Sequence, residues 1–166
     1  MSSIRPCRDS ERDAILSIVN AAAEAYRGVI PVDRWHEPYM PGEELDGEIA
    51  AGVSFSGYES DDGELLGVMG IQPVRDVVLI RHAYVVPDAQ GRGIGGELLS
   101  HLVAMADRQL LVGTWATAGW AIRFYERHGF ELVESRERTA DLLRSYWDIP
   151  ARQVETSVVL EGPRRR

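Results

Sequence analysis

A glycine-rich loop directly before an apolar helix is the feature that most limits what this chain can fold into. Residues 85–99 read VVPDAQGRGIGGELL, and four of the six residues from Gly91 to Gly96 are glycine. Glycine costs backbone entropy on folding and weakens a helix, so such a cluster is typical of backbone that must come close to something. We call residues 90–96 the glycine loop. It predicts a strand, loop, helix unit in which a strand over Val77–Val86 ends at Pro87.

Hydrophobic periodicity along the rest of the chain alternates between the strand type and the helix type. We predict strands over residues 3–7, 53–59, 64–73, 77–86, 110–116, 130–134 and 154–160. We predict helices from an N-cap at Asp9 or Ser10 to a stop at Gly28, over Glu43–Ala51, from the glycine loop to Ala106, over residues 120–128 and over Glu137–Trp147. Hairpins near both ends and a strand, helix, strand unit in the middle indicate an α/β sheet of mixed direction.

Length, charge and cysteine content narrow the class of protein. The 166 residues, 45% of them hydrophobic, predict a single domain over 1–166, with residues 162–166 as a disordered basic tail. A net charge of -8 argues against a nucleic-acid partner. No apolar run is long enough to cross a bilayer and no signal-peptide layout opens the chain, so we expect a cytoplasmic protein without a membrane partner. The one cysteine, Cys7, excludes an internal disulfide and is expected to be a buried structural side chain.

Three kinds of loop use glycines in this way. A nucleotide-hydrolase phosphate loop requires GxxxxGK[ST], and the chain contains no lysine at any position, which excludes it. A dinucleotide fingerprint, GxGxxG, is matched by Gly91, Gly93 and Gly96, but it should directly follow a strand and precede an acidic residue by about 20 positions. Here residues 87–90 intervene and the next predicted strand ends at Ala116 without an acid, which disfavours this interpretation.

The third kind of loop, Q/R-x-x-G-x-G/A between a strand and a helix, is satisfied by Gln90, Gly93 and Gly95. A helix N-terminus offers unpaired N–H groups and the positive end of the dipole, and glycines let a pyrophosphate approach them. Arg92 adds a positive charge nearby. The loop therefore predicts a pyrophosphate site, with a glycine-rich helix cap that binds no ligand as the alternative.

A second motif, AIRFYERHGF at residues 121–130, follows after one more predicted strand. Together the two motifs resemble those of the GNAT superfamily, the acyl-CoA-dependent N-acyltransferases, over Val77–Val133. The resemblance implies the GNAT fold, an α/β fold whose mixed central sheet of about six to seven strands is flanked by helices and splayed in the middle. It also implies acetyl-CoA as the co-substrate, and no metal.

The resemblance carries specific roles to positions of this chain. The strand before the loop would hold the pantetheine arm, and the amide of Val85 would polarise the acetyl carbonyl. Tyr125 matches the tyrosine that protonates the departing thiolate, with a core aromatic as the alternative. The residues that the resemblance assigns to the cofactor are Ala83, Tyr84, Val85, Gln90, Gly91, Arg92, Gly93, Ile94, Gly95 and Gly96.

Two positions depart from the family pattern. Many members carry a glutamate base on the strand before the loop, yet VVLIRHAYVV contains no carboxylate. His82 lies on that strand and is our candidate base, the alternatives being a structural histidine, deprotonation through water, and Glu44 or Glu59. The second departure is Ala118, where members often have an asparagine that contacts the coenzyme, and Thr114 or Thr117 is available to compensate.

The acceptor is the least determined part of the interpretation. Family members usually form its pocket from the first two helices and the loop between them, which predicts an aromatic-lined cleft or, alternatively, ordinary core packing. The candidate residues there are Tyr26, Trp35, His36, Tyr39, Met40 and Glu43. The helix over Glu137–Trp147 is predicted to cover that cleft, to form a subunit contact or to pack as core, which leaves a homodimer open.

Two classes of function follow. The first is an N-acetyltransferase that transfers the acetyl group directly to an amine, on a small molecule or on a protein. The second is an acyl-CoA-binding sensor that keeps the cofactor site without turnover. The presence of Tyr125 beside the glycine loop favours the enzyme.

Overall fold

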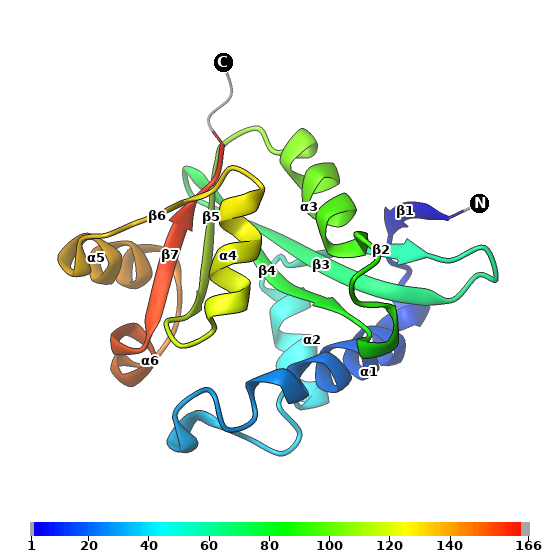
Figure 1. The fold of residues 1–166 in the computed structure, drawn as a ribbon, viewed down its shortest axis with the longest axis horizontal. Coiled ribbons are helices and arrows are strands. Elements are labelled where there is room, and N and C mark those ends of the chain that lie inside the picture. Colours follow the sequence, from blue (N-terminus) through cyan, green and yellow to red (C-terminus); the bar gives the residue numbers. More distant parts are fainter. Residues whose placement is uncertain (1, 164–166) are drawn as a thin grey trace.

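Within residues 2–163, which the computed structural model describes, a seven-stranded sheet carries helices on both faces (Figure 1). The strands are β1 (Ser3–Pro6), β2 (Ser54–Glu59), β3 (Leu65–Val74), β4 (Val77–Val85), β5 (Gln109–Trp115), β6 (Glu131–Leu132) and β7 (Ser157–Glu161). They lie in the order β1-β2-β3-β4-β5-β7-β6, with β4 and β5 parallel and the other neighbours antiparallel. The predicted α/β sheet of mixed direction is therefore confirmed.

Six α-helices and four short 3-10 helices connect the strands of this described part. The α-helices are α1 (Arg12–Ala22), α2 (Gly42–Ala50), α3 (Ile94–Met105), α4 (Gly119–Arg127), α5 (Arg136–Tyr146) and α6 (Ala151–Glu155). The 3-10 helices are η1 (Asp9–Glu11), η2 (Ala23–Tyr26), η3 (Val32–Arg34) and η4 (Pro87–Ala89). No helix within residues 2–163 is long and apolar enough to span a bilayer.

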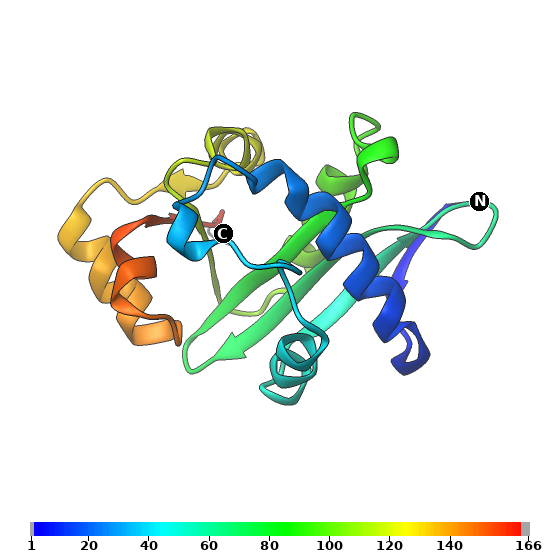
Figure 2. The same cartoon turned by 90° about the horizontal axis from the view of Figure 1, so that it is seen from below.

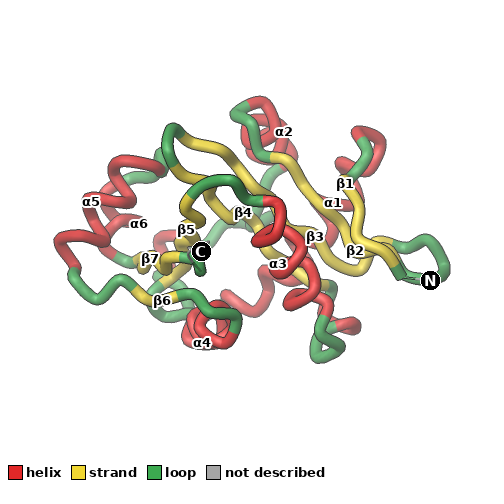
Figure 3. Tube along the Cα trace, turned by 90° about the horizontal axis from the view of Figure 1, so that it is seen from above, coloured by secondary structure: helices red, strands yellow, loops and turns green. Residues whose placement is uncertain are grey.

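The two faces of the sheet carry different helices. Seen from below, α1 crosses in front of the sheet (Figure 2), and seen from above, α3 does (Figure 3). Alternate residues of β4 separate the two cores, because Val78 and Ile80 pack with Leu98 of α3, whereas Leu79 packs with Leu143 of α5. Helices α5 and α6 thus cover the face opposite α3.

A bulge in β4 changes this alternation at His82. Arg81 pairs with Gly70 and Tyr84 with Val68, so two residues of β4 oppose one residue of β3. His82 has a left-handed φ of 54°, which is uncommon for a residue with a side chain. Beyond the bulge, β4 no longer pairs with β5, because their pairing ends at Ile80 and Val112. The predicted splay in the middle of the sheet is this divergence.

Helix α1 begins and ends differently from the prediction. Asp9 and Ser10 do not cap it, because they lie inside η1, where the N–H of Arg8 donates to the Glu11 carboxylate over 2.7 Å. The α-helix ends at Ala22 and continues only as η2 to Tyr26, before Gly28 takes a φ of 76°. Glu11 therefore occupies the cap position of α1, but its side chain bonds back to Arg8 and not to the first turn of the helix.

The C-terminal part contains three corrections. The strand predicted over 154–160 is wrong at its start, because α6 begins after Pro150 and its Val154 N–H donates to Pro150 O over 3.1 Å. Strands β6 and β7 pair in antiparallel fashion, but α5 and α6 separate them, so the hairpin expected there is absent from the described chain. Gly162 is buried and donates to Leu110 O over 2.8 Å, so it belongs to the ordered core, and residues 164–166 of the predicted tail lie outside the described residues.

The helix predicted over Glu137–Trp147 is confirmed as α5. Leu143 is fully buried in the core beneath it, and Trp147 packs against the backbone of Gly113, where an added Cβ would lie 3.2 Å from the indole. The segment was expected to cover the cleft, to form a subunit contact or to pack as core, and Leu143 packs as core. Trp147 also lines the cavity described next.

Candidate active site

Strands β4 and β5 diverge beyond their paired residues (Figure 1). A cavity of about 690 Å³ lies where they diverge. It lies between the two strands, the residues that follow α1, helix α4 and the segment after α5. Its lining includes Tyr26, Tyr39, Arg81, His82, Ala83, Tyr84, Val85, Trp115, Trp120, Tyr125 and Trp147. The fold therefore brings together predicted cofactor, catalytic and acceptor residues that are far apart in sequence.

Ala83, Tyr84 and Val85 form one border of this cavity. Here β4 pairs with β3 alone, so its other backbone edge faces the gap. An unpaired strand edge presents N–H and C=O groups that an extended ligand can pair with. The Gln90 side chain donates from Nε2 to Val85 O over 3.1 Å, which joins the glycine loop to the end of the strand.

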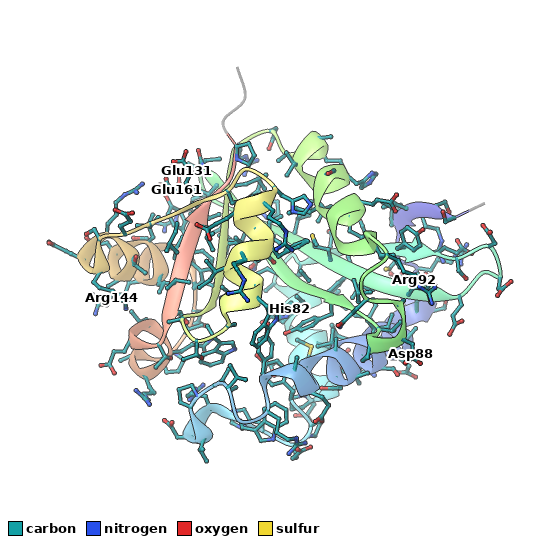
Figure 4. All side chains as sticks on the ribbon, viewed as in Figure 1. His82, Asp88, Arg92, Glu131, Arg144 and Glu161 are labelled. Carbon is teal, nitrogen blue, oxygen red and sulfur yellow. The ribbon has the colours of Figure 1, made fainter. Side chains whose placement is uncertain are left out.

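Gly91 and Gly93 give the glycine loop its shape. Their φ angles are 83° and 81°, in the left-handed region that glycine adopts without steric cost. A Cβ added to either residue would meet nothing within 4 Å, so both lie against open space. Gly93 is the N-cap of α3, and Arg92 beside it donates to Asp88 O over 3.2 Å (Figure 4).

The first turn of α3 faces the same open space. Glu97 makes the first bond of the helix, from its N–H to Gly93 O over 3.0 Å, so the N–H groups of Ile94, Gly95 and Gly96 precede it and have no partner in the helix ladder. The Ile94 side chain is buried, so this residue contributes only its backbone. Three N–H groups at a positive helix end, beside glycines that leave room, fit a pyrophosphate.

Gly95 and Gly96 have a further role that the motif did not reveal. An added Cβ would lie 3.4 Å from the Phe124 ring at Gly95 and 2.7 Å from His128 Nε2 at Gly96. These two glycines therefore let α4 approach α3 closely. The same face borders a groove of about 1060 Å³ that runs along the glycine loop and reaches Arg127.

Tyr125 lies on α4, between this groove and the cavity. Its side chain is only 6% exposed, and its ring packs on Phe124 and Phe130 with centroid distances of 5.1 and 5.6 Å. The ring also lines the cavity. Burial raises the pKa of the Tyr125 hydroxyl, so its oxygen carries a proton at neutral pH.

His82 also lines the cavity, next to the bulge (Figure 4). Its ring stacks on Phe55 with centroids 6.1 Å apart, and its buried Nε2 lies 3.4 Å from Oε2 of Glu48 on α2. Arg81 contacts the same Glu48 oxygen at 3.0 Å. Although burial by itself raises the pKa of Glu48, its interactions with His82 and Arg81 lower it overall, so the carboxylate is ionised.

The two glutamates considered as alternative bases lie in different surroundings. Glu59 accepts a hydrogen bond from Arg5 Nε over 2.6 Å on the β1 side of the sheet, and it does not line the cavity. Glu44 lies one turn before Glu48 on α2, and burial raises the pKa of its carboxyl. Glu44 does not line the cavity either.

An aromatic wall closes the acceptor side of the cavity. We give this name to Tyr26, Tyr39, Tyr84, Trp115 and Trp120. The Tyr26 ring lies 5.6 Å from that of Tyr39 and 5.7 Å from that of Trp120. The Trp115 indole donates to the Tyr39 hydroxyl over 3.1 Å, and the Tyr84 hydroxyl interacts with those of Tyr26 and Tyr39. The sequence analysis did not predict the side chains of Tyr84, Trp115 and Trp120 on the acceptor side, and it assigned Tyr84 only a backbone role.

The other predicted acceptor residues lie outside the cavity lining. Trp35 packs behind Tyr39 at 5.7 Å and carries the Arg27 guanidinium 4.6 Å above its ring. His36 and Glu43 are exposed. Met40 is buried in the core, where its backbone is held by two hydrogen bonds with the Asn20 side chain.

Of the residues near the expected asparagine contact, Thr114 lines the cavity, whereas Ala118 and Thr117 do not. Ala118 is buried at the N-cap of α4. The Thr114 side chain lines the cavity and hydrogen-bonds with the Tyr26 hydroxyl. Thr117 is exposed. Within residues 2–163, no three His, Cys, Asp or Glu side chains are grouped as metal ligands would be.

Comparison with known proteins agrees with this geometry. Residues 53–132 match the family model of the acetyltransferase (GNAT) domain. Over this segment, which is just under half of the chain, the sequence resembles the acetyltransferases of the GNAT family. No curated protein sequence gives a significant match.

Solved structures share the fold over nearly the whole chain. A GNAT-family acetyltransferase from Staphylococcus aureus Mu50 superposes with a TM-score of 0.73 at 13% identity, covering 98% of both chains. The PaiA N-acetyltransferase from Thermoplasma acidophilum, in complex with coenzyme A, gives 0.71 at 16% identity and 99% of both chains. The ribosomal-protein-S18-alanine N-acetyltransferase from Escherichia coli gives 0.68 at 19% identity, over 98% of this chain and 94% of that one. At these identities the similarity establishes the GNAT fold.

Proposed function

We propose that this protein transfers the acetyl group of acetyl-CoA directly to an amine bound against the aromatic wall. One observation carries the proposal. The free N–H groups of α3 border the groove, the unpaired edge of β4 and the buried Tyr125 border the cavity, and the two openings share Val85, Gln90 and Phe124 in their linings. This order suits a pyrophosphate, an extended arm and a thioester, in that sequence. The T. acidophilum relative, which was solved with coenzyme A, supports the choice of ligand.

Each chemical requirement of the transfer has a residue available. The amine nitrogen attacks the thioester carbon while its proton passes to His82, directly or through one water. The Val85 N–H stabilises the carbonyl oxygen as it becomes negative. The carbon–sulfur bond then breaks, and Tyr125 gives its proton to the sulfur. No covalent bond to the protein is formed, since both substrates occupy one cavity and proximity supplies much of the rate.

The lining of the cavity favours an acceptor with an apolar or aromatic body. Five aromatic side chains face the acceptor side, and none of the residues that line the cavity is an Asp or Glu. The Arg81 charge is neutralised by Glu48. The E. coli relative acts on a protein alanine, so a protein amino group belongs in the test beside small amines.

The experiment is thiol release from acetyl-CoA across a panel of amines. The panel contains aromatic and aliphatic primary amines, polyamines and peptides with a free N-terminal amine. Release that requires the amine, with the acetylated product identified by mass spectrometry, supports the proposal. Tight binding of coenzyme A without release on any amine favours the sensor, the second candidate function.

A further inference from the structure

Two consecutive residues of β4 contact one carboxylate on α2. Arg81 Nη2 lies 3.1 and 3.0 Å from Oε1 and Oε2 of Glu48, and His82 Nε2 lies 3.4 Å from Oε2. The side chains are largely buried, with exposures of 18% for Arg81, 14% for His82 and 19% for Glu48. In a regular strand two consecutive side chains point to opposite faces, so this shared contact needs an explanation.

The bulge supplies the explanation. Because His82 and Ala83 together oppose one residue of β3, the alternation shifts, and Arg81 and His82 lie on the same face. Arg81 is fixed from its other side, where Nη1 donates to Gln72 Oε1 over 2.8 Å. A strained backbone at His82 therefore directs the imidazole toward Glu48 and keeps it there.

The two ring nitrogens of His82 lie in different environments. Nε2 is buried, makes no hydrogen bond of ordinary geometry, and has Glu48 as its nearest acid, with Oε2 3.4 Å away. The ring lines the cavity, so Nδ1 is the nitrogen available to a ligand. A carboxylate beside one nitrogen favours the tautomer that carries its proton there.

We infer that Glu48 is a positioning residue, which holds the proton of His82 on Nε2 and leaves Nδ1 free to accept the proton of the acceptor amine. This inference rests on the proposed function. In the step, the N–H bond of the amine breaks, its proton binds Nδ1, and the imidazolium that forms is stabilised by the Glu48 carboxylate. The proton then leaves to solvent, which restores the neutral ring.

Charged groups from every neighbouring element enter the pH dependence of this step. Glu48 and Glu44 face His82 from α2, and Arg81 faces it from β4. His36, in the loop before α2, interacts with Glu44. Removing the Glu48 charge destabilises the imidazolium, because Arg81 then remains as the unbalanced positive neighbour.

The first test needs no substrate. Two-bond proton–nitrogen spectra of the protein labelled with ¹⁵N-histidine report the tautomer of each ring. We expect His82, assigned by its loss in His82→Gln, in the Nε2–H form at mildly alkaline pH, and a smaller Nε2–H fraction in Glu48→Gln. An Nδ1–H ring in the wild type overturns the inference, even if acetyl transfer is confirmed. Conversely, failure of every amine as an acceptor removes the proposed function without deciding the tautomer.

The second test uses the best amine from the panel. An orienting carboxylate is worth up to about 10⁴ in kcat in hydrolase triads, and we expect a smaller loss of about ten- to a hundredfold for Glu48→Gln, because the contact is long and shared. The acidic limb of the kcat/KM profile should also move to lower pH. A lower rate with an unmoved limb shows only a structural role and overturns the inference.

Asp46→Asn is the matched control. Asp46 is on the same helix and also pairs with an arginine, through Oδ1 to Arg12 Nε at 2.6 Å, but it lies on the exposed side. Its variant should keep the wild-type rate, pH limb and tautomer. Glu48→Asp, which keeps the charge on a shorter side chain, should restore the position of the limb toward that of the wild type. Failure of this variant to move the limb back contradicts the role of the charge.

Discussion

The Trp115 indole donates a hydrogen bond of 3.1 Å to the Tyr39 hydroxyl across 76 residues of sequence. It joins the end of β5 to the loop before α2 and so closes the acceptor side of the gap that the splayed strands leave open. The bonded pair belongs to the aromatic wall, where Tyr39 also packs on Tyr26. This hydrogen bond between two distant segments is thus one of the contacts that fix the shape of the acceptor part of the cavity.

Replacing Tyr39 with phenylalanine tests this dependence. The ring stays, but the Trp115 N–H loses its partner, so the free energy of unfolding should fall by about 1 kcal/mol. The KM of the acceptor amine should rise several-fold, while the affinity for coenzyme A should not change. Urea denaturation, steady-state kinetics and calorimetry measure the three quantities. In a double-mutant cycle with Trp115→Phe, additive losses would contradict a direct coupling of the two side chains.

Substitution of Gly93 by valine should abolish binding of coenzyme A. The new side chain would occupy the open space beside the N–H groups of α3, and the positive φ also costs about 1 to 2 kcal/mol of stability for a residue with a Cβ. Calorimetry measures the affinity and urea denaturation the stability. Gly63→Val is the control, because Gly63 has a similar φ of 83° in the β2–β3 turn. It should lose comparable stability and bind coenzyme A normally, and equal affinities in the two variants would remove the glycine loop as the phosphate site.

The fold around the glycine loop is predictable because its signals are local. Pro87 ends the strand, Gly93 caps the helix, and the apolar spacing of α3 needs no partner to be recognised. Helix α6 is not predictable in this way. Its Val154 is part of an apolar pattern that fits a strand, and only packing of that side chain into the α5 core decides for the helix.

The candidate site can be predicted only where its residues belong to a local sequence motif. The glycine loop and Tyr125 follow from motifs, but the contact of Glu48 with His82 requires a helix docked on the sheet and a bulge that turns two consecutive side chains to one face. A histidine with a positive φ has no sequence signal. The aromatic wall likewise assembles from five segments, namely η2, the loop before α2, β4, β5 and α4. Trp120 belongs to it only because α4 lies beside the residues that follow α1.

Acid should weaken the fold through Glu11. Two hydrogen bonds from Arg5, of 2.8 and 2.9 Å, lower the pKa of Glu11 to about 2, and the N–H of Arg8 contributes further. A carboxylate with a lowered pKa in the folded state stabilises the protein above its unfolded pKa, near 4.3, and loses that contribution as the pH falls toward 2. Glu11→Gln should therefore be less stable than the wild type at neutral pH, and the difference should shrink between about pH 5 and pH 2. Urea denaturation across this range measures it, and a constant difference in unfolding free energy would contradict the ion pair's role.

His82→Gln should lower kcat/KM near neutral pH if His82 accepts the amine proton. The variant should also lose the acidic limb that a catalytic base gives to the kcat/KM profile. Affinity for coenzyme A should remain, since the ring lies beside the bulge and away from the glycine loop. Wild-type kinetics in His82→Gln would return the residue to a structural role and favour deprotonation through water.

Tyr125→Phe should remove the proton donor and leave the rest of the site intact. The ring is buried among Phe124 and Phe130, and a phenylalanine fills the same volume, so stability and affinity for coenzyme A should survive. General acid catalysis is typically worth about 10² to 10⁴ in rate, which corresponds to about 3 to 5 kcal/mol of barrier. We therefore expect kcat on the best amine to fall by that factor, with the affinity measured in parallel.

A control variant at a second tyrosine distinguishes the general effect of removing a hydroxyl from the loss of the catalytic proton donor. Tyr146, the last residue of α5, donates to Asp76 Oδ1 over 2.7 Å at the surface, outside the lining of the cavity. Tyr146→Phe should have little effect on stability and leave kcat unchanged. If Tyr125→Phe binds coenzyme A normally and turns over at the wild-type rate, the thiolate takes its proton from water. Tyr125 is then only a core aromatic.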